Sequence, residues 1–425
     1  MKYHLGLCII LWFYKSLTAT FTFGQIANSP YSSQGYGEPH FTNNVREVGM
    51  SGLSTVDASP LFINQQNPAL LQHNKLTIFD AGLFVEQRNS TWAHEKLFRS
   101  YGGNLMYLAL GFPVSSRWTT SFQLSPLSYV NYQNRRVVTI DGADYSSSLL
   151  ESQAEGGISH VSWANGFGID KKGKISVGTS LGYAFGNLIY QSYSQIIDSL
   201  TGLDNMRVGI YEKLTLRGLV YKGGFFLTDT IFRKTSLNIG FTATNRPVLH
   251  SFFQRQTERS TNIYTFIDTL AYQQSSKFQL PEEYQLGLAL ERKYYYLIGT
   301  EVGIIRGENF LHPTRGKKLR NGYFVNIGGE YTPNFQSVTS YFKRVTYRGG
   351  FRYIQHPWYL NNESIQEINF SAGITFPMPN FASFNFATVV GVRAYHLTQG
   401  VKENFFRFCL GITINERWFV RRRFD

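Results

Sequence analysis

The sequence predicts an all-β fold: a 14-stranded antiparallel transmembrane β-barrel with an N-terminal hatch segment in or near its lumen. The first observation is strict alternation, clearest in residues 404–419, where Phe406 and Phe408 alternate with Arg407 and Cys409. A period of two places the apolar set on one face of a strand and the small or polar set on the other. The second observation is that this pattern recurs through most of the chain, as a barrel between lipid and a wet lumen requires.

Composition is the third observation. Aromatic residues make up 16% of the 425 residues, as many as the charged residues, and Gly is three times as frequent as Pro, 39 against 13. Aromatic girdles and glycine-rich strand faces are typical of membrane barrels. The net charge of +13 would suggest nucleic acid as the partner of a soluble protein. For an exported barrel we expect no nucleic acid, and anionic outer-leaflet lipid, anionic solutes or an acidic protein fit the charge better.

The chain is predicted to begin with a secretory signal peptide, residues 1–24. Lys2 and His4 precede an apolar run, residues 5–14, which is too short to cross a bilayer as a helix. We therefore expect the mature protein in the outer membrane, with both termini in the periplasm. Cys409 is the single cysteine after the signal peptide, so no disulfide framework is expected.

Residues 25–74 form the predicted hatch segment. They show no two-residue alternation and are rich in Gly, Ser, Pro and Asn, which suit turns and brief helices. Because the segment precedes the first strand, it must lie at the periplasmic mouth or fold up into the lumen. Asn67 and Pro68 give it a rigid turn, for which two interpretations are open: a gate of the lumen, or a purely structural turn of a plug.

Residues 75–420 hold the predicted barrel, fourteen alternating segments, most of them as long as the roughly 9–11 residues of a tilted membrane strand. They are 76–85, 104–112, 117–133, 157–170, 174–190, 206–227, 234–246, 282–291, 294–305, 321–333, 340–354, 366–376, 382–396 and 404–419. Residues 262–272 also resemble a strand, but we assign them to a loop because one chain with both ends on the same side needs an even strand number.

The predicted connections alternate in length. Short ones such as 115–116, 171–173 and 292–293 are separated by longer ones, among them 134–156 and 247–281. Short periplasmic turns and long extracellular loops are typical of outer-membrane barrels. The basic tail, residues 421–425, then lies in the periplasm.

Several short motifs resemble a known family. Residues 44–70, which end in Asn67-Pro68-Ala69-Leu70, are similar to the hatch of long-chain fatty-acid transporter (FadL-type) barrels, and residues 280–287 resemble that family's Leu-Pro-x-x-Tyr-x-Leu-Gly strand entry. Residues 29–32 and 418–423 resemble the FadL-like outer-membrane proteins of Bacteroidota. The resemblance implies 14 strands, a hatch in the lumen and, in the type members, inward diffusion of hydrophobic molecules.

The resemblance does not fix a cargo. The element around Asn67 reads Gln66-Asn67-Pro68-Ala69-Leu70 and lacks the family's usual aromatic and glycine neighbours. Some of the Bacteroidota barrels that the chain resembles are non-transporting subunits of the type IX secretion system, and another plugs the translocon of that system. Function therefore cannot be carried over from the fold.

Five arginines are predicted to form a basic wall of the lumen: Arg344, Arg348, Arg352, Arg393 and Arg407. Each falls on the polar face of its segment, and a charge facing mid-bilayer lipid would cost roughly 2–4 kcal/mol. One interpretation is that the wall attracts an anionic headgroup or solute. The other is that the arginines pair with Glu283, Glu301, Glu330 and Glu367 inside the barrel and hold the hatch.

The sequence contains no zinc motif, nucleophile elbow or phosphate-binding loop, so we predict no enzyme, catalytic residue, metal or cofactor. The first hypothesis is passive passage of hydrophobic or amphipathic solutes past the hatch. The second is a non-catalytic accessory or plug subunit of an outer-membrane protein-secretion (type IX) or barrel-assembly complex. A third is an open porin. The expected partners are outer-membrane lipid and either hydrophobic small molecules or a subunit of such a complex.

Overall fold

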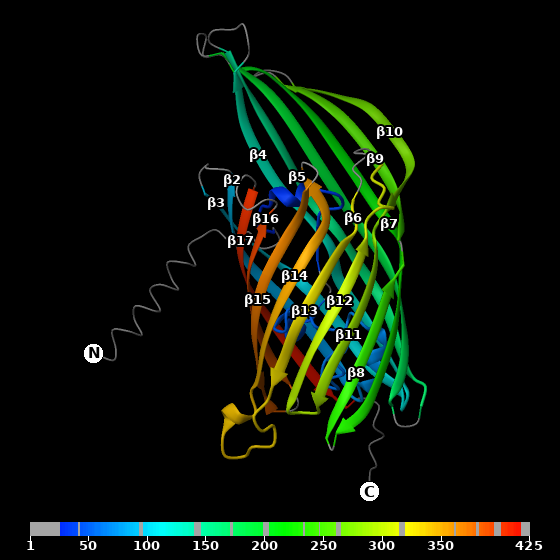
Figure 1. The fold of residues 1–425 in the computed structure, drawn as a ribbon. Helices are drawn as coiled ribbons and strands as arrows, with labels where there is room; N and C mark the ends of the chain where they lie inside the picture. Colours follow the sequence, from blue (N-terminus) through cyan, green and yellow to red (C-terminus); the bar gives the residue numbers. More distant parts are fainter. Residues whose placement is uncertain are drawn as a thin grey trace, which may run out of the picture.

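The computed structural model describes residues 26–40, 43–92, 97–139, 146–170, 173–198, 204–232, 234–245, 247–260, 265–313, 319–360, 363–379, 382–394 and 401–417. The predicted signal peptide and the basic tail lie outside these residues. The described chain forms one antiparallel sheet, closed by the pairing of the last strand, β17, with β2 from Val401–Trp92 to Glu416–Thr77. Figure 1 shows the resulting barrel.

The wall consists of β2 (Thr77–Trp92), β3 (Phe98–Ser115), β4 (Trp118–Thr139), β5 (Ser146–Gly168), β6 (Ile175–Asp198), β7 (Asp204–Phe232), β8 (Thr235–Thr244), β9 (Val248–Ser260), β10 (Thr265–Gln279), β11 (Glu282–Arg292), β12 (Tyr296–Arg306), β13 (Gly322–Tyr331), β14 (Thr346–Leu360), β15 (Glu363–Pro377), β16 (Ser383–Ala394) and β17 (Val401–Glu416). Consecutive strands pair from β2 to β8 and from β11 to β17, and β9 pairs with β10. In addition β9 pairs with β7, above β8, and β11 pairs with β8, below the pair of β9 and β10.

The sixteen described wall strands count as fourteen, because β8 and β9 form one interrupted strand and β10 and β11 form another. β8 and β9 are both antiparallel to β7 and pair with its lower and upper parts, so they act as one long strand that is interrupted between Thr244 and Val248. β10 and β11 likewise pair with β9 and β8 and join across Leu280 and Pro281. The predicted 14-stranded antiparallel barrel is therefore confirmed.

Two predicted loops are wrong. Of the predicted loop 247–281, residues 248–260 form β9 and residues 265–279 form β10, which includes 265–272 of the segment 262–272. Of the predicted loop 134–156, residues 134–139 belong to β4 and residues 146–156 to β5. In these stretches the backbone continues to pair although both faces carry polar residues, so the apolar alternation that marks a membrane strand disappears while the strand goes on. The predicted strand 340–354 starts too early, because the 3-10 helix η3 (Tyr341–Lys343) precedes β14.

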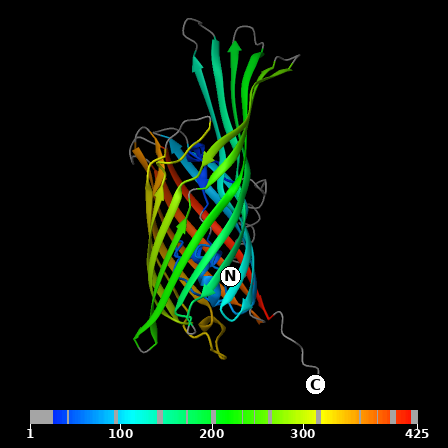
Figure 2. The ribbon, with the colours of Figure 1, turned by 90° about the vertical axis from the view of Figure 1, so that its right-hand side faces the viewer.

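The two ends of the barrel differ in height. On one side β4 to β7, β9 and β10 rise well above the rim at which the other strands end (Figures 1 and 2). We call these upper parts the extension; it comprises residues 130–139, 146–156, 187–198, 204–216, 251–260 and 265–276. The opposite end has short turns, such as residues 116–117 and 293–295, and we call it the turn end.

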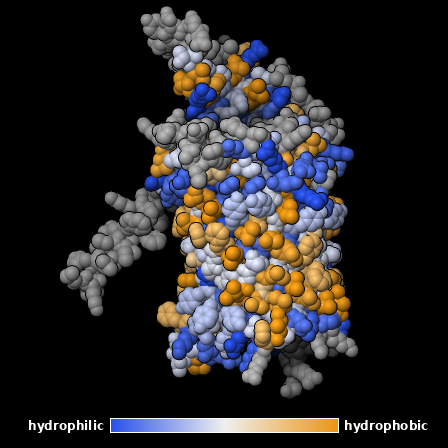
Figure 3. Space-filling view, viewed as in Figure 1, coloured by the Kyte–Doolittle hydropathy of each residue, from blue (hydrophilic) through white to orange (hydrophobic). Residues whose placement is uncertain are grey.

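The outer wall is apolar. Its exposed side chains include Leu83, Phe122, Trp163, Leu181, Leu219, Phe241, Leu288, Val302, Ile327, Phe370 and Phe406. In Figure 3 hydrophobic side chains gather on the barrel wall, and hydrophilic ones replace them toward the extension. An apolar band of this kind is what a lipid-facing barrel surface requires. Separately, none of the described helices has the length and apolar character needed to cross a bilayer.

The described residues that precede β2 lie inside the barrel, as the blue segment in Figures 1 and 2 shows. We call residues 26–40 and 43–74 the luminal segment. It contains η1 (Pro30–Ser33), β1 (Glu38–Pro39), α2 (Val45–Val48) and η2 (Pro68–His73), and β1 pairs with β4 on the inside of the wall. Most of its residues are buried.

Candidate functional site

The luminal segment and the inner wall make the candidate site, and η2 is its most tightly fitted part. The small inner face of β6 seats this helix: a Cβ on Gly178 would lie 2.3 Å from the carbonyl carbon of Pro68, and one on Gly224 of β7 only 2.2 Å from Asn67 Oδ1. Real Cβ atoms do not approach other atoms so closely. Glycine at these positions is therefore required for the helix to touch the wall.

Asn67 and Pro68, the predicted hatch residues, start η2. Asn67 Oδ1 accepts from the backbone N–H of Ala69 at 3.1 Å, which caps the helix. Its Nδ2 donates to the carbonyls of Thr55 at 2.9 Å and Phe225 at 3.2 Å. Pro68 at the first helical position needs no N–H partner there. One side chain thus ties together two turns of the luminal segment and the barrel wall.

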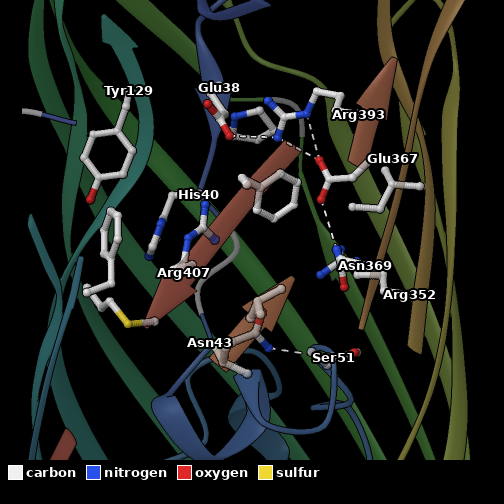
Figure 4. A pocket seen from close by; sticks show the side chains of 18 of the residues that line it. Glu38, His40, Asn43, Ser51, Tyr129, Arg352, Glu367, Asn369, Arg393 and Arg407 are labelled. Atoms are coloured by element: carbon white, nitrogen blue, oxygen red, sulfur yellow. Dashed lines mark hydrogen bonds and ion pairs between the residues drawn. The ribbon is translucent and has the colours of Figure 1, made fainter. Parts of the chain in front are cut away.

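An ion-pair network joins the other side of the lumen to β1 (Figure 4). Glu38 accepts from both terminal nitrogens of Arg88 at 2.6 and 2.7 Å, and from Arg393 at 2.8 Å. Arg393 also contacts Glu367 at 2.7 Å and Glu403 at 3.5 Å. The five side chains are between 0 and 8% exposed, so the contacts are closed off from solvent.

The network continues along the wall. Arg407 Nε donates to Glu86 at 2.8 Å, and Glu86 also contacts Arg88. His356 Nε2 lies 3.0 Å from Glu367, and Ser29 of the luminal segment donates to Glu403 at 2.7 Å. Such multiply bonded pairs satisfy the buried charges that would otherwise be costly in the interior.

A second cluster holds α2. Arg46 reaches Asp57 at 3.0 Å within the luminal segment and Glu330 of β13 at 2.7 Å. Arg348 of β14 donates to the same Glu330 at 3.0 Å. Nearby, Glu301 of β12 accepts from the backbone N–H groups of residues 54 and 55 at 3.1 and 2.8 Å. Side chains of the wall therefore contact both side chains and backbone groups of the luminal segment.

The titratable groups of the luminal segment are shifted in different directions. Burial alone would raise the pKa of Glu38, but the guanidinium groups of Arg393 and Arg88 outweigh it and hold the pKa well below its usual range. Burial, and then Arg407, lowers the pKa of His40 to about 3. Burial raises the pKa of Asp57 to about 6 against the attraction of Arg46. The ion pairs thus keep Glu38 charged, while His40 stays neutral.

Four of the five predicted wall arginines face the lumen. Arg348, Arg393 and Arg407 pair with carboxylates, as described, and the Arg352 guanidinium lies 4.6 Å from the ring centroid of Phe324 and lines a cavity. Arg344 was wrongly placed, because it is an exposed residue at the end of η3, stacked on Tyr341 at the turn end.

The residues on which the network depends were not predicted from the sequence. Glu38 and Arg46 lie in the segment without alternation, so no pattern marked the direction of their side chains. Glu86 and Arg88 continue the polar face of β2, whose predicted strand stopped at residue 85. Following the alternation three residues further, to residue 88, would have found this pair.

The start of the luminal segment, Ile26 and Asn28, lines a hollow of about 310 Å³ that opens among Tyr101, Gln133 and Gln153. Further along the segment, inside the lumen, less space remains. A cavity of about 70 Å³ lies between His40, Arg352 and Phe405 (Figure 4), and another of about 120 Å³ lies between Tyr36, His160 and Lys222. Ligand pockets usually measure roughly 300–1,000 Å³. Both cavities are large enough for a few water molecules. Among the described residues no three His, Cys, Asp or Glu side chains are grouped as metal ligands.

Comparisons with known proteins give a family and a fold. A family model described as BamG matches residues 7–425. The structure resembles a Pseudomonas aeruginosa FadL homologue (11% identity, 90% of this chain and 100% of the other, TM-score 0.57) and the Ralstonia pickettii toluene transporter TbuX (13%, 89% and 99%, 0.55). It also resembles the P. putida toluene transporter TodX (13%, 91% and 100%, 0.55). At these identities the likeness concerns the FadL-type fold alone. No curated protein sequence matches the chain.

Proposed function

The chain belongs to the BamG family, and from this premise we propose that it is a non-catalytic accessory subunit of an outer-membrane complex that assembles or secretes proteins. The lumen in this proposal is a filled scaffold and not a path. We place the protein in the outer membrane, with the turn end toward the periplasm and the extension outside. The name of the matched family is in keeping with a barrel-assembly complex, which we therefore put before a secretion complex.

The observation that carries this proposal is how firmly the luminal segment is bound. Charged pairs fix it at Glu38 and Arg46, and backbone contact fixes it at η2. Removing one partner of a buried ion pair costs about 3–5 kcal/mol, so a movement that separates several at once is strongly opposed. The cavities of about 70 and 120 Å³ inside the lumen are smaller than a ligand pocket. The larger hollow, about 310 Å³ at Ile26 and Asn28, opens toward Gln133 and Gln153 of the extension.

A pull-down of the tagged full-length protein from native membranes tests the proposal. We expect a large partner in stoichiometric amount, together with fewer correctly folded outer-membrane barrels in cells that lack the protein. Recovery of the protein with lipid and without any partner protein would contradict it.

Passage of hydrophobic or amphipathic solutes is the second candidate. It is supported by the shared fold, since two of the similar structures are titled toluene transporters. Under this function the luminal segment acts as a hatch that must move for each passage. Any passage would then depend on breaking the contacts that η2 and Glu38 make with the wall.

A lock between luminal segment and wall distinguishes the two functions. Ser51 Oγ and Ser371 Oγ lie 2.7 Å apart, one on each side of the interface. Replacing both by cysteine and oxidising them prevents the segment from leaving. An accessory subunit keeps its partner and its activity in cells when locked, whereas a hatch loses solute uptake. The single variant Ser51→Cys is the matched control.

A further inference from the structure

The outer surface carries a row of basic side chains at the base of the extension. Arg217 of β7 lies directly opposite His250 of β9, and His250 lies directly opposite Lys277 of β10. Cross-strand partners point to the same face of a sheet. All three side chains are exposed, and none has an ion-pair or hydrogen-bond partner among the described residues. Arg217 and Lys277 carry their positive charges on either side of His250, and an anion between them would be attracted by both.

This row lies where the apolar band ends. Two residues lower on the same strands and on the same face, Leu219 is 44% and Val248 40% exposed, and both belong to the lipid-facing wall. A hollow of about 480 Å³ opens here between Tyr183, Tyr221 and His250. It forms because β8 gives way to β9, and Asn245 bonds to the backbone of Tyr221 at this break. The positive charges therefore stand at headgroup height above an apolar wall.

A second row lies on the same outer face about six residues higher, roughly 20 Å along the strands. It runs across five neighbouring strands in direct register: Gln133 of β4, Gln153 of β5, Gln191 of β6, Tyr211 of β7 and Gln256 of β9. All five side chains are at least partly exposed. Amide groups donate and accept hydrogen bonds at once, and a tyrosine ring offers an apolar face with a polar end. This combination suits the hydroxyl groups and ring faces of sugars.

We propose that the outer wall below and along the extension binds a phosphorylated glycolipid. Its phosphate lies on Arg217, His250 and Lys277, its acyl chains lie against the apolar wall below them, and its sugars follow the glutamine row upward. A charge-assisted contact from a guanidinium or ammonium group is the strong kind of hydrogen bond that phosphate accepts. This site lies outside the lumen and is independent of either function proposed above.

The arrangement is not explained by internal pairing. Glu155, an exposed carboxylate of the same outer face, lies on β5, two strands away from Arg217 and opposite Ile189. Higher in the extension, by contrast, Arg135 does pair with Glu151 at 3.1 Å. Within the extension the charge of Arg135 is therefore paired with a carboxylate, whereas in the described chain the row of Arg217, His250 and Lys277 at its base is not.

Binding of purified full-length protein to defined lipids tests the proposal. Native mass spectrometry of the detergent-solubilised protein would use bisphosphorylated lipid A, the same lipid with its core oligosaccharide, and inorganic phosphate. We expect the double variant Arg217→Gln, Lys277→Gln to bind lipid A roughly tenfold more weakly. Lys234→Gln, an exposed lysine of the turn end, is the matched control and should bind like the wild type.

The sugar contact has its own variant. Gln153→Ala with Gln191→Ala should weaken binding of the form with core oligosaccharide several-fold and leave lipid A unchanged. The control is Ser152→Ala with Ser192→Ala, the adjacent cross-strand pair on the opposite face of the same strands. Heat-dependent gel mobility checks that every variant is folded.

Equal lipid A affinity of the wild type and the Arg217, Lys277 double variant would overturn the proposal. Inorganic phosphate that competes with lipid A at equal concentration would also overturn it, since the site would then serve a soluble anion. A glutamine-row variant that binds both glycolipids like the wild type would overturn the sugar contact.

Discussion

The two sides of the barrel hold the luminal segment in different ways. On the side of β2 and β13 to β17, the wall offers arginines and glutamates that pair with Glu38 and Arg46. On the side of β4 to β7, it offers small side chains and lets η2 approach the backbone. The first side holds the luminal segment through ion pairs. The second side holds it through direct contact with the backbone of η2, which glycines without side chains make possible.

This difference predicts opposite sensitivities. A buried charge pair fails when atoms are removed, because the remaining charge is left unpaired in the interior. A close backbone contact fails when atoms are added, because a packed interior has no room for them. Substitutions of both kinds, on both sides, separate these two mechanisms.

The largest effect is expected for Arg393→Ala. It leaves Glu38, Glu367 and Glu403 without their shared partner, and breaking a buried pair costs about 3–5 kcal/mol. Urea unfolding in lipid vesicles should show this loss, and trypsin should cut the luminal segment sooner. Arg344→Ala, at the exposed turn end, is the control and should change stability by less than about 0.5 kcal/mol. Equal effects of the two variants would show that the ion pairs of Arg393 do not hold the luminal segment.

Gly178→Ala should have the next largest effect, about 1–3 kcal/mol, because its methyl group would meet the Pro68 carbonyl. Gly223→Ala is a matched control on the neighbouring strand, since a Cβ there meets nothing within 4 Å. The same unfolding assay measures both. If Gly178→Ala behaves like Gly223→Ala, η2 does not depend on close contact with the wall.

The sequence predicted the barrel well because the wall obeys one local rule. Lipid outside and a polar interior impose alternation on every strand, so each segment such as 404–419 carries the signal by itself. The rule ends where the lipid ends. In the extension both faces are polar, and β9 and β10 were therefore taken for a loop although their backbones remain paired.

The candidate site was less predictable because its contacts join distant parts of the chain. Asn67 and Pro68 were found from a local turn, and the Arg393 side chain was placed in the lumen from alternation alone. That Arg393 meets Glu38, 355 positions away in the sequence, follows from no local pattern. Gly178 belongs to an alternating run of small residues from Ser176 to Gly186 in the sequence, but only the structure reveals that η2 packs against it.

Acid should weaken the charged side by a smaller amount. The pKa of His40 is lowered to about 3 by burial and then by Arg407, so the folded protein keeps it neutral. The unfolded chain takes up its proton near 6.5, so stability falls as the pH drops below 6.5 and is unaffected above it. Between pH 6.5 and 5.5 the loss is about 1 kcal/mol.

The difference between wild type and His40→Gln isolates this term, because other groups titrate in both proteins. Asp57, with its pKa raised to about 6, acts in the opposite direction and gains stability as it is protonated. Hydrogen exchange of residues 43–74 at pH 7.0 and 5.5 measures the change. An identical pH response of the two proteins would show that His40 is protonated in the folded state as well.

The smallest effect is expected in the extension, where charge pairs face solvent. Arg255 donates to Glu212 at 2.8 Å, but its side chain is 39% exposed, and such pairs contribute about 0.2–1 kcal/mol. Arg255→Ala should therefore change the urea midpoint only slightly, and less still in high salt, which screens exposed pairs. Arg393→Ala should remain equally damaging at both salt concentrations, because solvent ions do not reach it. If Arg255→Ala lost as much stability as Arg393→Ala, and the loss did not depend on salt, the extension would be closed off from water like the lumen. The contrast between the buried ion pairs of the luminal segment and the exposed ion pairs of the extension would then no longer hold.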